Sequence, residues 1–410
     1  MPDKGQSGEG ADKPAANVSE KPAAGPGRRS AHPANPLSRW LPSIKVTLAA
    51  IALALVVGAV LILVSDREVI ESFRYFFSYP WDAIRNSGVA IGESYWALVT
   101  GSVGSWDAIG ATLERAAPLI CAGLAVTLAF RAGLFNIGAQ GQLQVGAICA
   151  AYVGFHYDLP PVVHVLAALV AGLVGGAVWG GIVGLLKART GAHEVITTIM
   201  LNYVAAALLT YLLTKEAFQQ AGSDNPRSDS VKADATFPDI LGVHAGIVLA
   251  IVAAVGVWWL LERSTVGFEL RAVGANADAG RTAGMSVAKV YTLAMIVAGL
   301  LAGLAGAQQV LGHEDALTAN FGGTIGFDAI TVALLGRATP LGTVLAGLLF
   351  GALSTGGLAM QASASTPLAL TQVLQALIVL FVAAPALVKV VFRFRETDGG
   401  GAVMAKGWNS

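Results

Sequence analysis

The chain has 410 residues, of which 55% are hydrophobic and 13% charged, and its mean hydropathy is +0.64. Soluble globular proteins carry about 25% charged residues, so this composition excludes an ordinary soluble protein. The 26 Lys and Arg residues balance the 26 Asp and Glu residues, which leaves no global basic field and predicts no nucleic-acid partner. Cys121 and Cys149 lie in apolar runs and are expected to fill the core rather than form a disulfide.

Uncharged runs of about 20 residues recur along the chain, and a helix of that length crosses a hydrocarbon core of about 30 Å. They predict an all-α polytopic membrane protein of about ten helices. In chain order, the expected helices are 45–64, 117–130, 142–157, 161–186, 194–213, 244–261, 290–311, 325–336, 340–358 and 367–389. The helix at 325–336 is too short to cross squarely, and it either spans or is re-entrant.

The ends of the chain differ in composition from its middle. Residues 1–44 are rich in Ala, Pro, Gly and charge and are expected to be a disordered cytoplasmic tail, followed by a transmembrane domain over 45–395 and a flexible tail over 396–410. Placing the N-terminus inside puts most Lys and Arg on the cytoplasmic side, so both termini are expected to be cytoplasmic. Residues 65–116 then lie outside, either as interfacial helices anchored by Trp81, Tyr95, Trp96 and Trp106 or as a folded loop.

The residue patterns of the common catalytic and metal sites are missing from the sequence. It contains no Walker-type phosphate-binding loop, no Cys/His cluster with metal-ligand spacing and no interpretable Ser–His–Asp set. We therefore predict no catalytic residue, no metal and no cofactor. Ionisable residues are also nearly absent from the expected spans, which favours a driving force from outside the chain over an internal ion relay.

Small residues repeat at helical spacing. Gly172, Gly176, Gly180 and Gly184 fall on one face of the helix expected at 161–186, and residues 299–303 and 347–351 repeat the four-residue interval. Such stripes let helix backbones approach closely in a membrane, so they predict a tightly packed bundle.

The segment 131–144 combines glycines with amide side chains. Gly133, Gly138 and Gly141 interrupt two apolar helices and predict a broken helix pair, and the polar residues there are Asn136, Gln140, Gln142 and Gln144. Unwound backbone at membrane depth is stable only when it is buried in protein or lines an aqueous path. The amides therefore either line a path for a neutral polar solute or clamp neighbouring helices together.

The loop 262–289 has the pattern of a short capped helix. Asn276 is a good N-cap, Asp278 falls in the first turn, and Gly284 is a plausible stop. A short rigid helix on the cytoplasmic side suits docking to another protein.

These two segments, with others, resemble the permease subunits of bacterial ABC importers for nucleosides, which are grouped with simple-sugar permeases. The similarity extends from about Leu48 to Arg395. It is strongest in FRAGLFNIGAQGQ (130–142), TTIMLNY (197–203), GFELRAVG (267–274) with AGM (283–285), and GFDAI (326–330) with LGR (335–337). The chain is similar to the larger of the two permease types, and members often carry Glu where this chain has Gln140.

The resemblance implies a non-catalytic translocation subunit of the bacterial plasma membrane. It implies a cytoplasmic coupling helix at 275–284 that docks on a separate ABC ATPase subunit, with Glu269, Arg271, Gly274, Asn276, Asp278 and Arg281 as coupling residues. It further implies a second, shorter permease, an external solute-binding lipoprotein and surrounding membrane lipid.

A nucleoside is the favoured small neutral polar solute, and the expected path residues are Asn136, Gln140, Gln142, Gln144 and Asn202. Three alternatives stay open at this point: a simple-sugar permease, an ion-coupled secondary transporter that works alone, and a membrane scaffold without a path.

Overall fold

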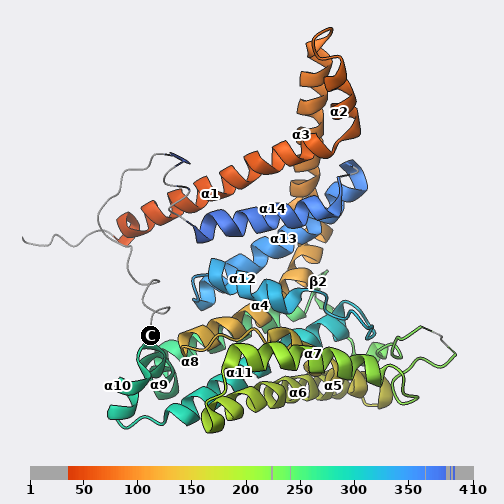
Figure 1. Cartoon of the computed structure of the whole chain (residues 1–410). Helices are drawn as coiled ribbons and strands as arrows, with labels where there is room; N and C mark the ends of the chain where they lie inside the picture. The colour runs from red at the N-terminus through yellow and green to blue at the C-terminus, as the bar shows by residue number, and fades with distance from the viewer. Residues whose placement is uncertain are drawn as a thin grey trace, which may run out of the picture. The chain divides into compact units, whose positions relative to one another are not determined.

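The computed structural model describes residues 36–222, 225–240, 242–364, 366–384, 388 and 391–392 (Figure 1). The chain divides into two units, residues 1–45 and residues 46–410, and the second unit holds the helix bundle. The predicted tail at 396–410 lies outside the described residues, as does the predicted N-terminal tail up to residue 35. Helix α1 already begins at Pro36, before the predicted start at 45.

Helices make up most of the described chain. They are α1 (Pro36–Ser65), α2 (Arg67–Arg74), α3 (Pro80–Val103), α4 (Trp106–Arg131), α5 (Ala139–His156), α6 (Pro161–Thr190), α7 (Glu194–Leu212), α8 (Gly246–Arg263), α9 (Thr265–Ala275), α10 (Ala277–Thr282), α11 (Val287–Gly312), α12 (Ile325–Leu335), α13 (Pro340–Ala364) and α14 (Leu368–Ala383). A short 3-10 helix, η1 (Ala233–Ala235), and an antiparallel pair of two-residue strands, β1 (Asp239–Ile240) and β2 (Val243–His244), lie between α7 and α8.

The prediction of an all-α polytopic membrane protein is confirmed. Seven of the described helices are long and apolar enough to cross a membrane, namely α1 over Leu48–Ser65, α4, α6, α7, α8, α11 and α13. Helices α12 and α14 are shorter and apolar. All ten predicted helices have a counterpart, and the predicted broken pair corresponds to α4 and α5 with residues 132–138 between them.

The predicted start of the second helix at 117 is wrong. Helix α4 begins at Trp106, where the Ser105 side chain accepts a hydrogen bond from the Ala108 N–H and Asp107 occupies the first turn. The last charge before the apolar run, Arg115, therefore lies inside the helix, and so does Pro118. The charged residue Arg115 shows where the apolar run begins, but the helix itself begins at its capping residue, Ser105.

Residues 66–103 fold into α2 and α3 rather than into irregular loop. Asp66 caps α2 by accepting from the Val69 N–H, and Pro80 opens α3. Helix α3 packs on α13 closely enough that a Cβ at Gly356 would lie 2.4 Å from the Leu98 carbonyl oxygen. Trp81, Trp96 and Trp106 are exposed, and their expected interfacial position stays a prediction.

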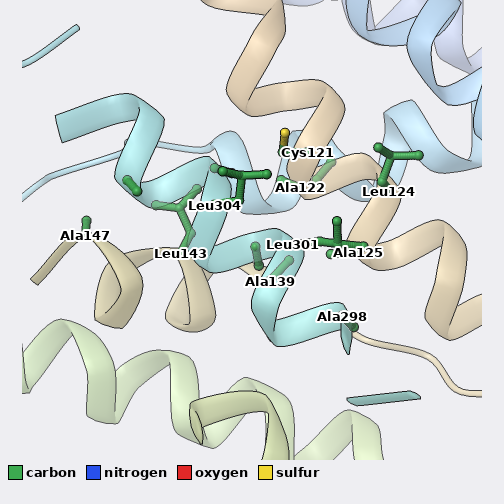
Figure 2. Close-up of a cluster of buried hydrophobic side chains, with 14 of the residues drawn as sticks. Cys121, Ala122, Leu124, Ala125, Ala139, Leu143, Ala147, Ala298, Leu301 and Leu304 are labelled. Atoms are coloured by element: carbon green, nitrogen blue, oxygen red, sulfur yellow. The ribbon is translucent and has the colours of Figure 1, made fainter. Parts of the chain in front are cut away.

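The core forms where α4, α5, α6 and α11 meet. Figure 2 shows Cys121, Leu124, Leu143 and Leu304 among the buried side chains that α4, α5 and α11 bring together. Cys121 is buried and free, as its apolar surroundings predicted. The glycine stripe of α6 lies directly on α11, since a Cβ at Gly176 would lie 2.3 Å from the Gly299 carbonyl oxygen. The close packing predicted from the four-residue repeat is therefore confirmed.

Candidate functional site

The break between α4 and α5 lies inside the bundle. Helix α4 ends at Arg131, Gly133 adopts the left-handed conformation (φ +73°), and α5 begins at Ala139. Gly138 packs against Thr198, one turn into α7, and Gly141 packs against Asn202, two turns in. The start of α5 therefore packs against the side of α7, one to two turns from the first residue of that helix.

Amide side chains satisfy the unwound backbone of this break. Asn136 Nδ2 donates to Gln142 Oε1 (3.0 Å), and Asn136 Oδ1 accepts from the Gly138 N–H (2.9 Å). Asn202 Oδ1 accepts from the Gly141 N–H (2.8 Å), while its Nδ2 donates to the Ile137 carbonyl (3.0 Å). Because a buried polar backbone group without a partner is costly, these bonds hold the break in one conformation.

Gln140 joins the break to a second interrupted segment. Its Oε1 accepts from the Gly326 N–H (2.7 Å), and its Nε2 donates to the Gly323 carbonyl (3.1 Å). Gly326 belongs to the first turn of α12, which has 11 residues and corresponds to the helix predicted at 325–336. The N-terminal turns of α5 and α12 therefore meet at Gln140, and irregular backbone containing the buried Phe321 leads into α12.

Gln144 differs from the other four predicted path residues. It is 6% exposed, and its Oε1 has no hydrogen-bond partner among the described residues. Gln142 and Asn136 bond to each other, and Asn202 and Gln140 bond to backbone. Of the predicted set, Gln144 therefore retains an amide oxygen that could accept a hydrogen bond from a solute.

The second predicted segment, 262–289, forms two helices. Asn276 accepts through Oδ1 from the N–H groups of Asp278 and Ala279, both at 3.0 Å, and Gly284 follows α10 with φ +85°. The predicted N-cap, first turn and stop of α10 are thus confirmed. Helix α9, which the sequence analysis did not predict, is capped by the Ser264 side chain.

The predicted coupling residues divide by exposure. Glu269, Asn276, Asp278 and Arg281 are exposed, and Arg281 pairs with Asp278 (2.8 Å). Arg271 is half-buried and pairs with Glu262 (3.1 Å). Exposed ion pairs contribute little to stability, so the first group is available to a partner surface at small energetic loss.

The sixth coupling residue, Gly274, brings the two predicted segments into contact. A Cβ at Gly274 would lie 2.3 Å from the Arg131 carbonyl oxygen and 2.8 Å from the Gly133 nitrogen. The last turn of α9 therefore rests on the backbone where α4 ends. The sequence analysis predicted both segments but not this contact. The sequence signals that could have indicated it are the glycines at the contact, Gly133 in one segment and Gly274 in the other.

A further residue that sequence reasoning missed is Arg131. Its Nε donates to the Ala338 carbonyl (2.7 Å) in the turn between α12 and α13. Arg337 and Ala338 have φ of 53° and 47°, a left-handed conformation that non-glycine residues rarely adopt. The end of α4 is thus fixed to this turn as well as to α9. No group of three or more potential metal-ligating side chains occurs within the described ranges.

Comparison with known proteins identifies the family. Residues 108–383 match the family described as the permease component of the branched-chain amino acid transport system. The guanosine ABC transporter permease of Bacillus subtilis is 39% identical over 357 residues, covering 86% of this chain and 96% of that protein.

Two further relatives carry different descriptions. A glucose ABC transporter permease of Haloferax volcanii is 37% identical over 303 residues (70% of this chain, 79% of its own length). A nucleoside ABC transporter permease of Lactococcus lactis is 34% identical over 309 residues (72% and 85%). With the family match spanning the broken helix pair, α9, α10 and α12, the chain belongs to this family of transport-system permease components.

Proposed function

We propose that the chain is the permease subunit of an ATP-driven importer for nucleosides in the bacterial plasma membrane. The observation that carries this proposal is the contact of Gly274 with Arg131 and Gly133, because it connects an exposed helix pair with the amide-lined break. The nucleoside assignment is supported by two relatives described as guanosine and nucleoside permeases. The glucose permease among the relatives makes a simple sugar the second candidate.

In this proposal, α10 docks on a separate ABC ATPase subunit. Glu269, Asp278 and Arg281 offer charges of both signs on the exposed surface of α9 and α10. A displacement of α9 moves the backbone at Gly133 directly, because the two glycines leave no side chain between them. The break then passes the motion to α5, which is how ATP binding and hydrolysis alternate access to the path.

The solute path runs beside α5. Gln144 is the proposed solute contact, and Asn136, Gln140, Gln142 and Asn202 set the geometry of the wall and act as gate residues when the break moves. An unpaired amide oxygen in a dry site favours solutes with hydroxyl or amino donors, which both nucleosides and sugars have.

The chain needs partners for the rest of the cycle. It carries no catalytic residue or cofactor in this proposal, and ATP is hydrolysed by the ATPase subunit. A second, shorter permease completes the path, and an external lipoprotein delivers the solute. The end of the bundle that holds α9 and α10 carries the cations Arg131, Lys187, Arg189, Arg263, Arg271, Arg281 and Lys289, which supports a cytoplasmic position for that end. The cytoplasmic position of both termini is part of the same proposal.

Reconstitution tests the proposal. Purified chain is placed in liposomes either alone with an imposed ion gradient, or together with the ATPase subunit, the second permease and the binding lipoprotein. Uptake of radiolabelled guanosine is expected only in the complete assembly with ATP, and unlabelled glucose should not compete. Uptake by the chain alone would refute the ATP-driven mechanism and favour a secondary transporter. Competition by glucose but not by adenosine would assign the sugar instead.

A further inference from the structure

A groove lies between α6 and α11 at the end next to α10. One part encloses about 320 Å³ between Leu185, Arg189, Lys289, Leu293 and Ile296. The adjoining part encloses about 420 Å³ and is lined by Lys187, Arg281 and Tyr291. Both parts share Ala188 and Ala288, so they form one continuous depression, which we call the α6–α11 groove.

Basic side chains line both parts of this groove. Arg189 and Lys289 line the first part, Lys187 and Arg281 line the second, and no carboxylate of the described residues lines either part. Lys187 is paired with Glu194 (2.6 Å) and Arg281 with Asp278 (2.8 Å). Arg189 and Lys289 have no ion-pair partner in the part of the chain that the structure describes. Two positive charges without an ion-pair partner therefore line the first part of the groove, one from α6 and one from α11.

Apart from Arg189 and Lys289, the first part of the groove is largely apolar and open. Leu185 is 42% exposed and Leu293 is 39% exposed. The exposed face of α6 continues from Leu185 through Ile182 to Val178, which is 58% exposed. Because α6 and α11 are long enough to cross a membrane, such a face adjoins hydrocarbon or another protein. Arg189 and Lys289, which lie near the ends of their helices, therefore adjoin an apolar surface that continues along α6.

We propose that the α6–α11 groove binds an anionic phospholipid. The headgroup phosphate lies between Arg189 and Lys289, and an acyl chain lies against Leu293 and Ile296. A lipid phosphate is the source that fits both the cations and the apolar lining of this part of the groove, because a free phosphate would leave the apolar lining uncovered. The proposal is independent of the identity of the transported solute.

The assignment also places the bound lipid beside the α10–α11 connection. Arg281, Met285 and Ser286 line the second part of the groove, so a lipid bound in the first part lies next to this connection. The lipid class that fits has one net negative charge at the phosphate, as phosphatidylglycerol has.

Native mass spectrometry of the full-length chain tests the proposal. The protein is delipidated and then exposed to an equal mixture of phosphatidylglycerol and phosphatidylcholine with identical acyl chains. Phosphatidylglycerol should be retained preferentially, and the double variant Arg189→Gln/Lys289→Gln should lower that preference roughly 30-fold, which corresponds to about 1 kcal/mol per cation near a membrane surface. The control Arg263→Gln/Lys215→Gln removes the same charge outside the groove and should keep the preference.

Three results would overturn the assignment. Equal retention of both lipids by the unaltered chain would show that the cations do not select a headgroup. An equal loss in the control variant would reduce the effect to net charge. Disappearance of the preference when the chain is purified together with its partner subunits would assign the groove to a subunit contact. Persistence of bound phosphatidylglycerol in the presence of 10-fold excess inorganic phosphate would support the acyl half of the site.

Discussion

Replacing Gly176 with Ala should destabilise the bundle by separating α6 from α11. The added Cβ would lie 2.3 Å from the Gly299 carbonyl oxygen and 2.6 Å from the Gly303 Cα. Both are backbone atoms, so no side chain can rotate to make room, and the helices must move apart. Inserting a methyl group into a packed core costs about 1–3 kcal/mol.

A matched control separates this packing effect from helix propensity. Gly256 lies within α8, and a Cβ added there would meet nothing within 4 Å. Replacing a mid-helix glycine by alanine favours the helix by about 0.5–1 kcal/mol. That gain is common to both variants, so the difference between Gly176→Ala and Gly256→Ala should be the packing loss alone, about 1–3 kcal/mol.

The assay is equilibrium unfolding by sodium dodecyl sulfate in mixed micelles, followed by tryptophan fluorescence. Gly256→Ala should be as stable as the unaltered protein or slightly more stable, and Gly176→Ala should unfold at lower denaturant. Equal free energies of unfolding for the two variants would refute the backbone contact between α6 and α11.

Three other substitutions test the proposed function. Asp278→Arg puts a second cation beside Arg281 on the exposed surface of α10. In the reconstituted assembly, ATP hydrolysis should persist while guanosine uptake falls at least 10-fold. Unchanged uptake would show that α10 is not part of the coupling contact. Asn136→Leu leaves the Gly138 N–H and the Gln142 amide without their partner and should lower the free energy of unfolding by about 1–3 kcal/mol and reduce uptake, whereas full uptake would exclude the break from the moving parts. Gln140→Glu keeps the acceptor for Gly326 but sets a carboxylate oxygen against the Gly323 carbonyl. The variant should therefore be less stable than wild type at pH 8, and its stability should approach that of wild type as the carboxyl is protonated at pH 5. A stability difference that does not change with pH would contradict this account of Gln140.

The helices of this protein could be predicted well from sequence because hydropathy and span length are local properties. The same holds for α10, where Asn276 and Gly284 act through the backbone next to them. The start of α4 could not be placed from hydropathy because the cap at Ser105 lies beyond the charges that end the apolar run. Local patterns therefore predict elements well and their ends less well.

The candidate site was only half predictable for a different reason. The sequence pointed to amides at the break, but whether an amide bonds to backbone or stays unpaired depends on segments far away in the chain, such as Gly323 and Gly326 for Gln140. The contact of Gly274 with Gly133 joins residues far apart in sequence and leaves no side chain to show it. Arg337 and Ala338 adopt the left-handed conformation although neither is a glycine, so their residue types do not predict this turn.

The glycine contact between α6 and α11 limits how the molecule can deform. Two helices whose main chains touch along several turns cannot slide or rotate past each other without a collision, so α6 and α11 must be displaced together as one body. The seven residues that separate α4 from α5, in contrast, have no such backbone contact along several turns and are held by a small set of side-chain hydrogen bonds. We therefore expect the α6–α11 pair to move as one body, and we expect a change of conformation to need the hydrogen bonds of residues 132–138 to break.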